Sequence, residues 1–352
     1  MNTRSTCRSA GMFLLIPVLL AAVACTSVGP SDSAAGPPAA ECLEGLPVPQ
    51  ETPAPPGEAQ PDAPEAPHLC RGPCLPLHTI EGMSGHFSVP SACLANPAPP
   101  GEILGHPSAG YIHVNLGNGK HLEAFSVTEV LWDRVELGYA LNYLDVGDVY
   151  EDIGNATGVR PSGHAVRLHT LNGRLQLLKD GEFDQSWLPA VTAGVHGKWN
   201  EDFDGLDRDL APLGGLDGIA GIDHEAGVEF TLFASKMLTC LPRPVMLTAG
   251  VRNTDAAHVG LLGFTRHRKT LFEAAACCLL TDRIVLAAEY RRKRSEYDET
   301  HGLLDREDDW FVLAAAFLVS DRCSVAAGYG HFGHVLNHTA NRSWGVAVKY
   351  EF

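Results

Sequence analysis

Alternation of apolar and polar residues with a period of two recurs in short segments after about residue 108, and it constrains the fold more than any other feature. The clearest case is the segment 341–352, NRSWGVAVKYEF. One of its faces carries only apolar or aromatic side chains, from Trp344, Val346, Val348, Tyr350 and Phe352. Because successive side chains of a β-strand point to opposite faces, each such segment predicts a strand with one apolar face.

The pattern predicts twelve strands in all. They lie near 109–116, 121–132, 134–144, 164–178, 187–199, 226–238, 244–253, 269–280, 284–296, 310–319, 323–332 and 342–352. The 164–178 segment changes phase around Asn172-Gly173, where a bulge or an extra hairpin could alter the count.

Two further features indicate that the apolar faces meet lipid. Aromatic residues lie toward the ends of the apolar faces, as in interfacial girdles: Trp132, Tyr143, Trp187, Trp199, Tyr290, Tyr329, Trp344 and Phe352. Short turns alternate with long polar loops at 145–163, 200–225, 254–268, 297–309 and 333–341. In hydrocarbon a sheet must close to pair every backbone group, so we expect a closed antiparallel transmembrane β-barrel of about 12 strands, within a range of 10–14. A soluble β-sandwich is the alternative.

The first 25 residues have the pattern of a secretory signal. GMFLLIPVLLAAVAC (11–25) follows Arg4 and Arg8 and is too short to span a bilayer comfortably. Ala22-Val23-Ala24-Cys25 resembles a lipoprotein signal, which predicts acylation of Cys25. An ordinary cleavage site near Cys25 and a retained membrane anchor are the alternatives.

Proline marks the next boundary, because 17 of the 24 prolines lie between Pro30 and Pro100. Residues 26–76 cannot supply a packed core, so we expect a disordered Pro/Ala/Glu-rich linker. Residues 77–107 are expected to form a plug-like or periplasmic segment, and 108–352 the barrel. An even strand number predicts that both barrel termini are periplasmic and that the barrel lies in the bacterial outer membrane.

The formal net charge of −16 argues against nucleic acid as a partner, because acidic patches repel phosphate. The expected partners are outer-membrane lipid and lipopolysaccharide. No metal site and no cofactor are expected. The acidic stretch 201–210 has the oxygen density of a calcium loop without the EF-hand order, and its weak candidates are Asp202, Asp204, Asp207 and Asp209.

Several motifs resemble the DUF3034 family, a set of exported Gram-negative proteins presumed to be outer-membrane barrels. They are TIEG (79–82), LPAVTAGVHGKWNED (188–202), PVMLTAGVRNTDA (244–256), GLLGF (260–264), IVLAAEYRRK (284–293) and DREDDWF (305–311). The resemblance implies the barrel fold and no activity. The proline-rich insert, Cys25 and the segment 83–107 depart from the family pattern. The terminal Tyr350 and Phe352 resemble the signal that such barrels present to the barrel-assembly machinery.

The strand faces opposite the apolar ones carry charges of both signs and are expected to line the lumen. The candidates are Glu136, Lys198, Glu229, Arg252, Glu273, Glu289, Arg291, Lys293, Lys349 and Glu351. Such charges suit a water-filled pore or a filled barrel whose ion pairs satisfy one another, and the pattern leaves both open. We expect a channel or transporter for an unknown small solute. The alternatives are a structural or surface-interaction envelope protein and, with no catalytic motif in its favour, an outer-membrane hydrolase or acyltransferase.

Overall fold

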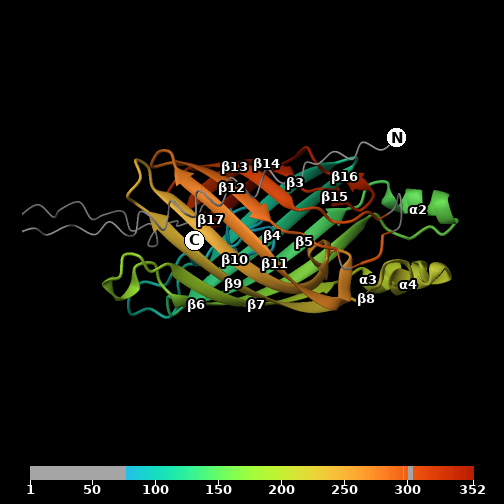
Figure 1. Ribbon diagram of the computed structural model, residues 1–352, viewed down its shortest axis with the longest axis horizontal. Coiled ribbons are helices and arrows are strands. Elements are labelled where there is room, and N and C mark those ends of the chain that lie inside the picture. The colour runs from blue at the N-terminus through green and yellow to red at the C-terminus, as the bar shows by residue number, and fades with distance from the viewer. Residues whose placement is uncertain (1–76, 296, 300–303) are drawn as a thin grey trace, which may run out of the picture. The chain divides into compact units, whose positions relative to one another are not determined.

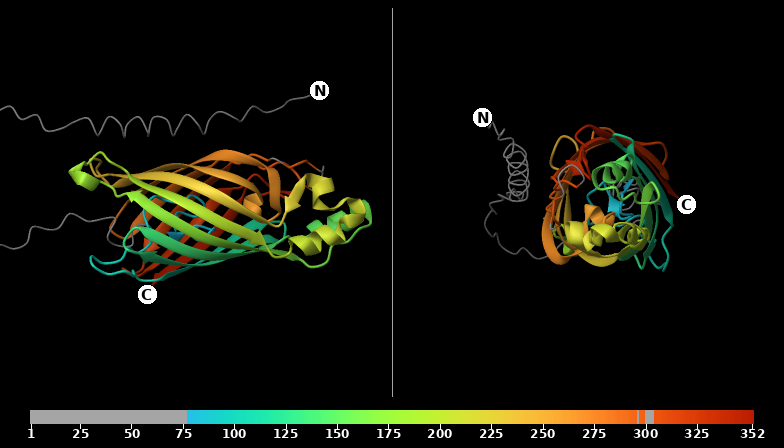
Figure 2. Two further views of the ribbon diagram at one scale, coloured as in Figure 1. Left: turned by 90° about the horizontal axis from the view of Figure 1, so that it is seen from below. Right: turned by 90° about the vertical axis from the view of Figure 1, so that its right-hand side faces the viewer.

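The computed structural model describes residues 77–295, 297–299 and 304–352. The expected signal sequence at 1–25, the acylated Cys25 and the linker at 26–76 lie outside these residues. In the part described, the strands form a closed barrel, seen from two sides and along its axis from the helical end (Figures 1 and 2).

Twelve long antiparallel strands form the ring. In chain order they are β3 (Ser108–Gly117), β4 (Lys120–Leu131), β5 (Val135–Asp145), β6 (Ala165–Leu178), β7 (Ala190–Asn200), β9 (Ala226–Leu238), β10 (Val245–Ala257), β11 (Gly263–Leu279), β12 (Ile284–Arg291), β13 (Trp310–Leu318), β14 (Cys323–His331) and β17 (Ser343–Glu351). The short β8 (Ile222–His224) extends the sheet beside β11. The last strand pairs with the first, from Glu351 beside Ser108 to Trp344 beside Asn115. The predicted barrel is therefore confirmed.

The alternation of side chains explains how these segments become a membrane-type barrel. In β17, Trp344, Val346, Val348 and Tyr350 point outward and remain 41–50% exposed, whereas the residues between them are buried. Apolar residues cover the outside of the other strands in the same way. The inward face carries polar and charged side chains together with buried aliphatic ones such as Val114, Leu122 and Leu168, whereas the outward face is apolar, as in a membrane barrel.

Short turns join the strands at the end where the barrel's chain begins and finishes. The side-chain oxygens of Thr281 and Ser320 each accept hydrogen bonds from backbone N–H groups two and three residues further on. This local bonding is typical of tight turns with hydroxyl residues and fixes two of the turns that contain an Asp-Arg step. A longer connection at the same end contains η1 (Glu182–Asp184).

Helices gather at the opposite end (Figures 1 and 2). They are α2 (Val149–Thr157), α3 (Phe203–Asp209), η2 (Ala211–Leu213), α4 (Gly215–Ala220) and η3 (His258–Gly260), and two short strands, β15 (His334–Val335) and β16 (His338–Thr339), accompany them. Among the residues described, no helix has both the length and the apolar character needed to cross a bilayer.

Three boundaries differ from the expected ones. β10 and β11 extend so far that the expected long loop 254–268 shrinks to a short connection at 258–262. β12 ends at Arg291 and not near 296. β6 runs straight through Asn172-Gly173, because Asn172 turns inward and its amide bonds inside the lumen, and the irregularity lies instead between Gln176 and Leu178.

Residues 77–98, which we call the plug, lie inside the ring of strands. The plug contains β1 (Leu77–His78) and β2 (Ser84–Gly85), which pair with each other. Almost all of its residues are buried. A segment of this length is too short to bury itself, so the surrounding wall buries it. The right-hand view of Figure 2 looks along the barrel and shows the start of the plug, in blue, within the ring.

Candidate functional site

The plug is attached to the barrel wall through polar side chains rather than through sheet pairing. The amides of Asn142 and Asn172 donate to the backbone carbonyls of Ile80 and Glu81, each at 2.7 Å. Thr192 donates to the carbonyl of Ala92 at 2.6 Å. Wall side chains therefore satisfy the backbone groups of an irregular segment that no strand accompanies, as burial requires.

Glu289 of β12 is one anchor. Its carboxylate accepts the backbone N–H groups of Phe87 at 2.9 Å, Ser88 at 2.7 Å and Val89 at 2.9 Å. It also accepts the Ser88 hydroxyl at 2.8 Å. Four bonds to one buried carboxylate fix this turn of the plug strongly, because hydrogen bonds to a charged acceptor are the strong ones.

Glu136 of β5 is a second anchor on another part of the wall. It accepts the hydroxyl of Ser84 at 2.7 Å and the backbone N–H of Ala95 at 2.8 Å. Arg174 of β6 neutralises it at 2.7 Å and reaches the carbonyl of Ser91. One ion pair of the wall thus holds both ends of the stretch 84–95.

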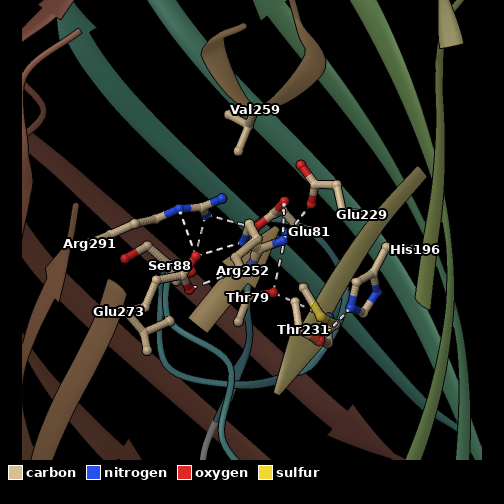
Figure 3. Close-up of polar contacts among 12 residues, drawn as sticks. Thr79, Glu81, Ser88, His196, Glu229, Thr231, Arg252, Val259, Glu273 and Arg291 are labelled. Carbon is tan, nitrogen blue, oxygen red and sulfur yellow. Dashed lines mark hydrogen bonds and ion pairs between the residues drawn. The ribbon is translucent and has the colours of Figure 1, made fainter. Parts of the chain in front are cut away.

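The centre of the lumen contains a balanced cluster of six buried charges, and Figure 3 labels all of them except Lys198. The carboxylates are Glu81, Glu229 and Glu273, and the cations are Lys198, Arg252 and Arg291. Glu81 is the only plug residue of the six and contacts all three cations, including Arg252 at 3.1 Å and Arg291 at 2.7 Å.

The wall charges pair with one another as well. Arg252 meets Glu229 at 2.6 Å and Glu273 at 2.6 Å, and Lys198 meets Glu229 at 2.9 Å. Each of these side chains is at most 2% exposed. Since a buried charge without a partner is costly, Glu81 completes a set in which three negative charges balance three positive ones.

The structure places every candidate lumen residue in the barrel interior or at its mouth. Glu136 and Glu289 hold the plug, and five others belong to the central cluster. Lys349 is buried beside Glu351, at 2.7 Å, near the short-turn end. Lys293 lies beyond the end of β12 and belongs to a separate group. Sequence reasoning missed Glu81, although it stands in the TIEG motif, because nothing in the pattern told where the plug lies.

The separate group lies at the helical end, where η3 meets the residues that connect β12 and β13. Lys293 meets Glu307 at 2.6 Å and sits 4.8 Å from the centre of the Trp310 ring. The Tyr297 hydroxyl lies 2.9 Å from Nε2 of His258. We call these residues, with Lys269 at 3.8 Å from Glu307, the mouth cluster.

The mouth cluster shifts the titration of its members. Burial would raise the pKa of Glu307, but the charges of Lys293 and its neighbours together lower it to about 2. Burial lowers the pKa of Lys293 to about 8 and that of His258 to about 4. At neutral pH the cluster therefore holds a charged pair beside a neutral imidazole.

Two histidines in the lumen are hydrogen-bonded to hydroxyl groups. His196 lies 2.7 Å from the amide oxygen of Asn172 and 2.8 Å from the Thr231 hydroxyl. His78 lies 2.8 Å from the hydroxyls of both Ser108 and Ser126. An imidazole between an orienting group and a hydroxyl is the geometry of a nucleophile and its base. All six of these residues are less than 8% exposed and are buried within the plug or between the plug and the wall, so the arrangement is that of satisfied interior polar groups.

The acidic residues of the 201–210 stretch turn away from one another. Asp202 binds Arg167 at 2.7 Å, Asp207 accepts the N–H of Leu216 at 2.7 Å, and Asp209 accepts the Ser162 hydroxyl at 2.6 Å. Asp204 lies in the first turn of α3. Within the described part of the chain, no group of three or more histidine, cysteine or acidic side chains is arranged to hold a metal ion.

Tyr350 and Phe352 lie on the outside of the barrel at its short-turn end, 42% and 58% exposed. Their ring centres are 5.2 Å apart, edge to face. Both are accessible on the lipid side, and their role in assembly stays a prediction.

Comparison with known proteins gives one family and several distant structures. The model of the family described as "Protein of unknown function (DUF3034)" matches residues 76–349. The KdgM porin is similar at 6% identity with a TM-score of 0.42, covering 70% of this chain and 99% of that one. The NanC porin has 7% identity and a TM-score of 0.41, covering 70% and 100%. The COG4313 outer membrane channel from Pseudomonas putida F1 has 12% identity and a TM-score of 0.38, covering 73% and 97%. No curated protein matches the chain.

Proposed function

This chain belongs to the DUF3034 family, as its motifs predicted, and we propose that it is an outer-membrane channel or transporter for small solutes that the plug keeps closed. The single observation that carries the proposal is the way the plug is held. Side chains of the wall bind it, and no wall strand pairs with it along its length. Such a segment can leave or shift without opening the ring, because the ring's own hydrogen bonds do not depend on it.

The membrane setting follows from the two faces of the sheet. A charged, filled lumen and an apolar exterior favour a lipid surround, and the short turns favour the periplasmic side for the end that carries Ser108 and Glu351. Both barrel termini then face the periplasm, and the helices at the other end face outward toward lipopolysaccharide.

A second candidate function rests on the same lumen. The six central charges balance without any bound solute, as expected of a barrel filled for stability. A non-conducting envelope protein that interacts through its surface loops would need no pathway. The two functions differ in whether release of the plug opens a conducting path.

Single-channel recording in planar bilayers tests this difference. We compare the wild type with Glu289→Ala, which removes the four bonds that hold residues 87–89, and with Glu201→Ala, an exposed carboxylate outside the lumen. The wild type and Glu201→Ala should open rarely. Glu289→Ala should raise the open fraction by about tenfold or more, since bonds to a charged acceptor each stabilise by ~1.5–3 kcal/mol. A folded Glu289→Ala that never conducts would favour the second function.

A further inference from the structure

An apolar cavity of about 270 Å³ lies at the helical end of the barrel. Residues from α2, α3, η2 and α4 line it together with the start of β6, and among them are Ile153, Leu206, Leu213 and Ile219. All the described residues around it are aliphatic except Tyr150 and Thr157. No charged side chain is among them, although acidic residues are frequent in the same loops.

The two hydroxyl groups of the cavity differ. Thr157 donates to the carbonyl of Ile153 at 2.7 Å and is thereby satisfied. Tyr150 has no hydrogen-bond partner among the residues that the structure describes. Burial, with Asp202 and Asp209 nearby, raises the pKa of Tyr150 to about 12. Its hydroxyl is therefore protonated at neutral pH and can donate one hydrogen bond.

A smaller cavity of about 40 Å³ lies deeper and reaches the plug. Ile80, Phe87 and Ser88 of the plug line it, together with wall residues and Trp310. Leu336 lines both cavities, so the two are neighbours across one side chain. The plug residues Phe87 and Ser88 are the same ones whose N–H groups bind Glu289. The apolar site at the mouth is thus separated from the anchored turn of the plug by the Leu336 side chain and the smaller cavity.

We propose that the mouth cavity binds one uncharged, hydrocarbon-like solute, of the size of one or two aromatic rings, with at most one polar group. A closed apolar cavity of ~150 Å³ accommodates benzene, and this one is larger. Water is a poor occupant, because it needs two to four polar partners and the surface that lines the cavity is almost wholly apolar. Charged or sugar-like solutes are excluded by the uncompensated loss of their hydration.

The role of this solute as the transported one rests on the proposed function, whereas the binding site rests on the cavity alone. A bound solute adds contacts at Leu336, next to the space that Phe87 and Ser88 border. This arrangement puts solute recognition at the helical end of the barrel and the anchored turn of the plug, residues 87–89, beyond the smaller cavity.

Equilibrium dialysis of radiolabelled naphthalene against the full-length protein in detergent tests the site. Leu213→Trp fills the cavity, and Leu241→Trp adds the same ring at an exposed position in the turn between β9 and β10, at the other end. The two variants have the same amino-acid composition. Subtracting the naphthalene bound by one from that bound by the other therefore cancels the naphthalene that partitions into micelles. Ala220→Leu, which also fills the cavity, replaces Leu213→Trp if the latter lacks the heat-dependent gel shift of a folded barrel.

The wild type and Leu241→Trp should bind about one naphthalene per chain, saturably, and Leu213→Trp about tenfold more weakly or worse. Tyr150→Phe should bind naphthalene as the wild type does and 2-naphthol several-fold less tightly. Naphthalene-2-sulfonate should not compete. Equal, unsaturable uptake by all variants, or competition by the sulfonate, overturns the inference. If the wild type binds no naphthalene but Glu289→Ala still conducts in planar bilayers, the cavity site is refuted and the channel is not. If naphthalene binds as expected but Glu289→Ala never conducts, transport is refuted and the site is not.

Discussion

Glu81 is the residue on which the central cluster depends, because it brings the third negative charge to three buried cations. It reaches them from the plug, while its partners belong to three separate strands of the wall. One side chain therefore joins the electrostatics of the wall to the position of the plug.

Replacing Glu81 by Gln should leave three buried cations with only two carboxylates, Glu229 and Glu273, and so one uncompensated positive charge in the cluster. We expect a loss of about 3–5 kcal/mol in the free energy of unfolding, as for other broken buried pairs. Urea unfolding in phospholipid vesicles measures it. Glu201→Gln, whose carboxylate is 46% exposed, should change stability by less than ~1 kcal/mol. A Glu81→Gln protein as stable as this control would show that the cluster does not need the plug's charge.

Glu307 gives the mouth a dependence on pH. Its pKa in the folded protein is about 2, below the ordinary 4.5, so the stabilisation is complete above pH 4.5 and is lost as the pH falls toward 2. The shift corresponds to roughly 3 kcal/mol. The difference in melting temperature between the wild type and Glu307→Gln should therefore be constant between pH 4.5 and about pH 7, where Lys293 is still charged, and shrink below pH 4.5. A difference that persists unchanged at pH 2 contradicts the assigned ion pairs.

Among the elements, the plug and β5 approach each other more closely than side chains would allow. A Cβ atom at Gly138 of β5 would lie 2.9 Å from the backbone oxygen of Gly82, which itself has a φ of +78°. Glycine on the wall and glycine in the plug thus meet backbone to backbone. At Gly197 of β7, by contrast, an added Cβ meets nothing within 4 Å.

Gly138→Val should consequently displace the plug and leave the ring closed. Cys93, a buried plug residue, reports this displacement in a background where the other cysteines are serine. We expect maleimide to label it at least about tenfold faster than in the parent, because local opening exposes it. Gly197→Val introduces the same side chain and should leave the labelling rate unchanged. If both variants label alike, the close contact does not hold the plug.

At the scale of the whole molecule, the outside of the barrel meets two environments: hydrocarbon along the strands and the aqueous interface at the turns. Leu313 lies within β13 on the outside and is 64% exposed. Leu241 lies in a turn and is 40% exposed. In water both would be ordinary surface residues that tolerate a charge. A surrounding bilayer makes a charge costly at Leu313 and not at Leu241.

Leu313→Lys should therefore destabilise the barrel in phospholipid vesicles by about 2–4 kcal/mol, the range for a cation near the middle of the bilayer. Leu241→Lys should change stability by about 0–1 kcal/mol, because the turn reaches the interface. Urea titration of both variants gives the comparison. Equal effects would argue against a lipid-facing β13.

The sequence alone determined the ring. The strand number, the approximate place of each strand and the choice of the outward face follow from alternation with a period of two, which is a property of neighbouring residues, whereas the ends of β10, β11 and β12 do not. In β9, for example, the outward face can be assigned from Val228, Phe230 and Leu232 without knowledge of any other strand. The inward position of Lys198 and Arg252 could be predicted for the same reason.

Only the tertiary structure decided what fills the ring. Glu81 is separated by more than a hundred residues from Lys198, Arg252 and Arg291, so no local pattern pairs them. The phase change at Asn172 suggested an irregular strand, and its real cause is a hydrogen bond to the plug. The mouth cavity likewise exists because loops distant in sequence pack over one end without filling it. Alternation assigns a side chain to the inward or the outward face of the sheet. Its ion-pair partners, and the cavities beside it, depend on how the sheet closes into a barrel and which segments enter the lumen.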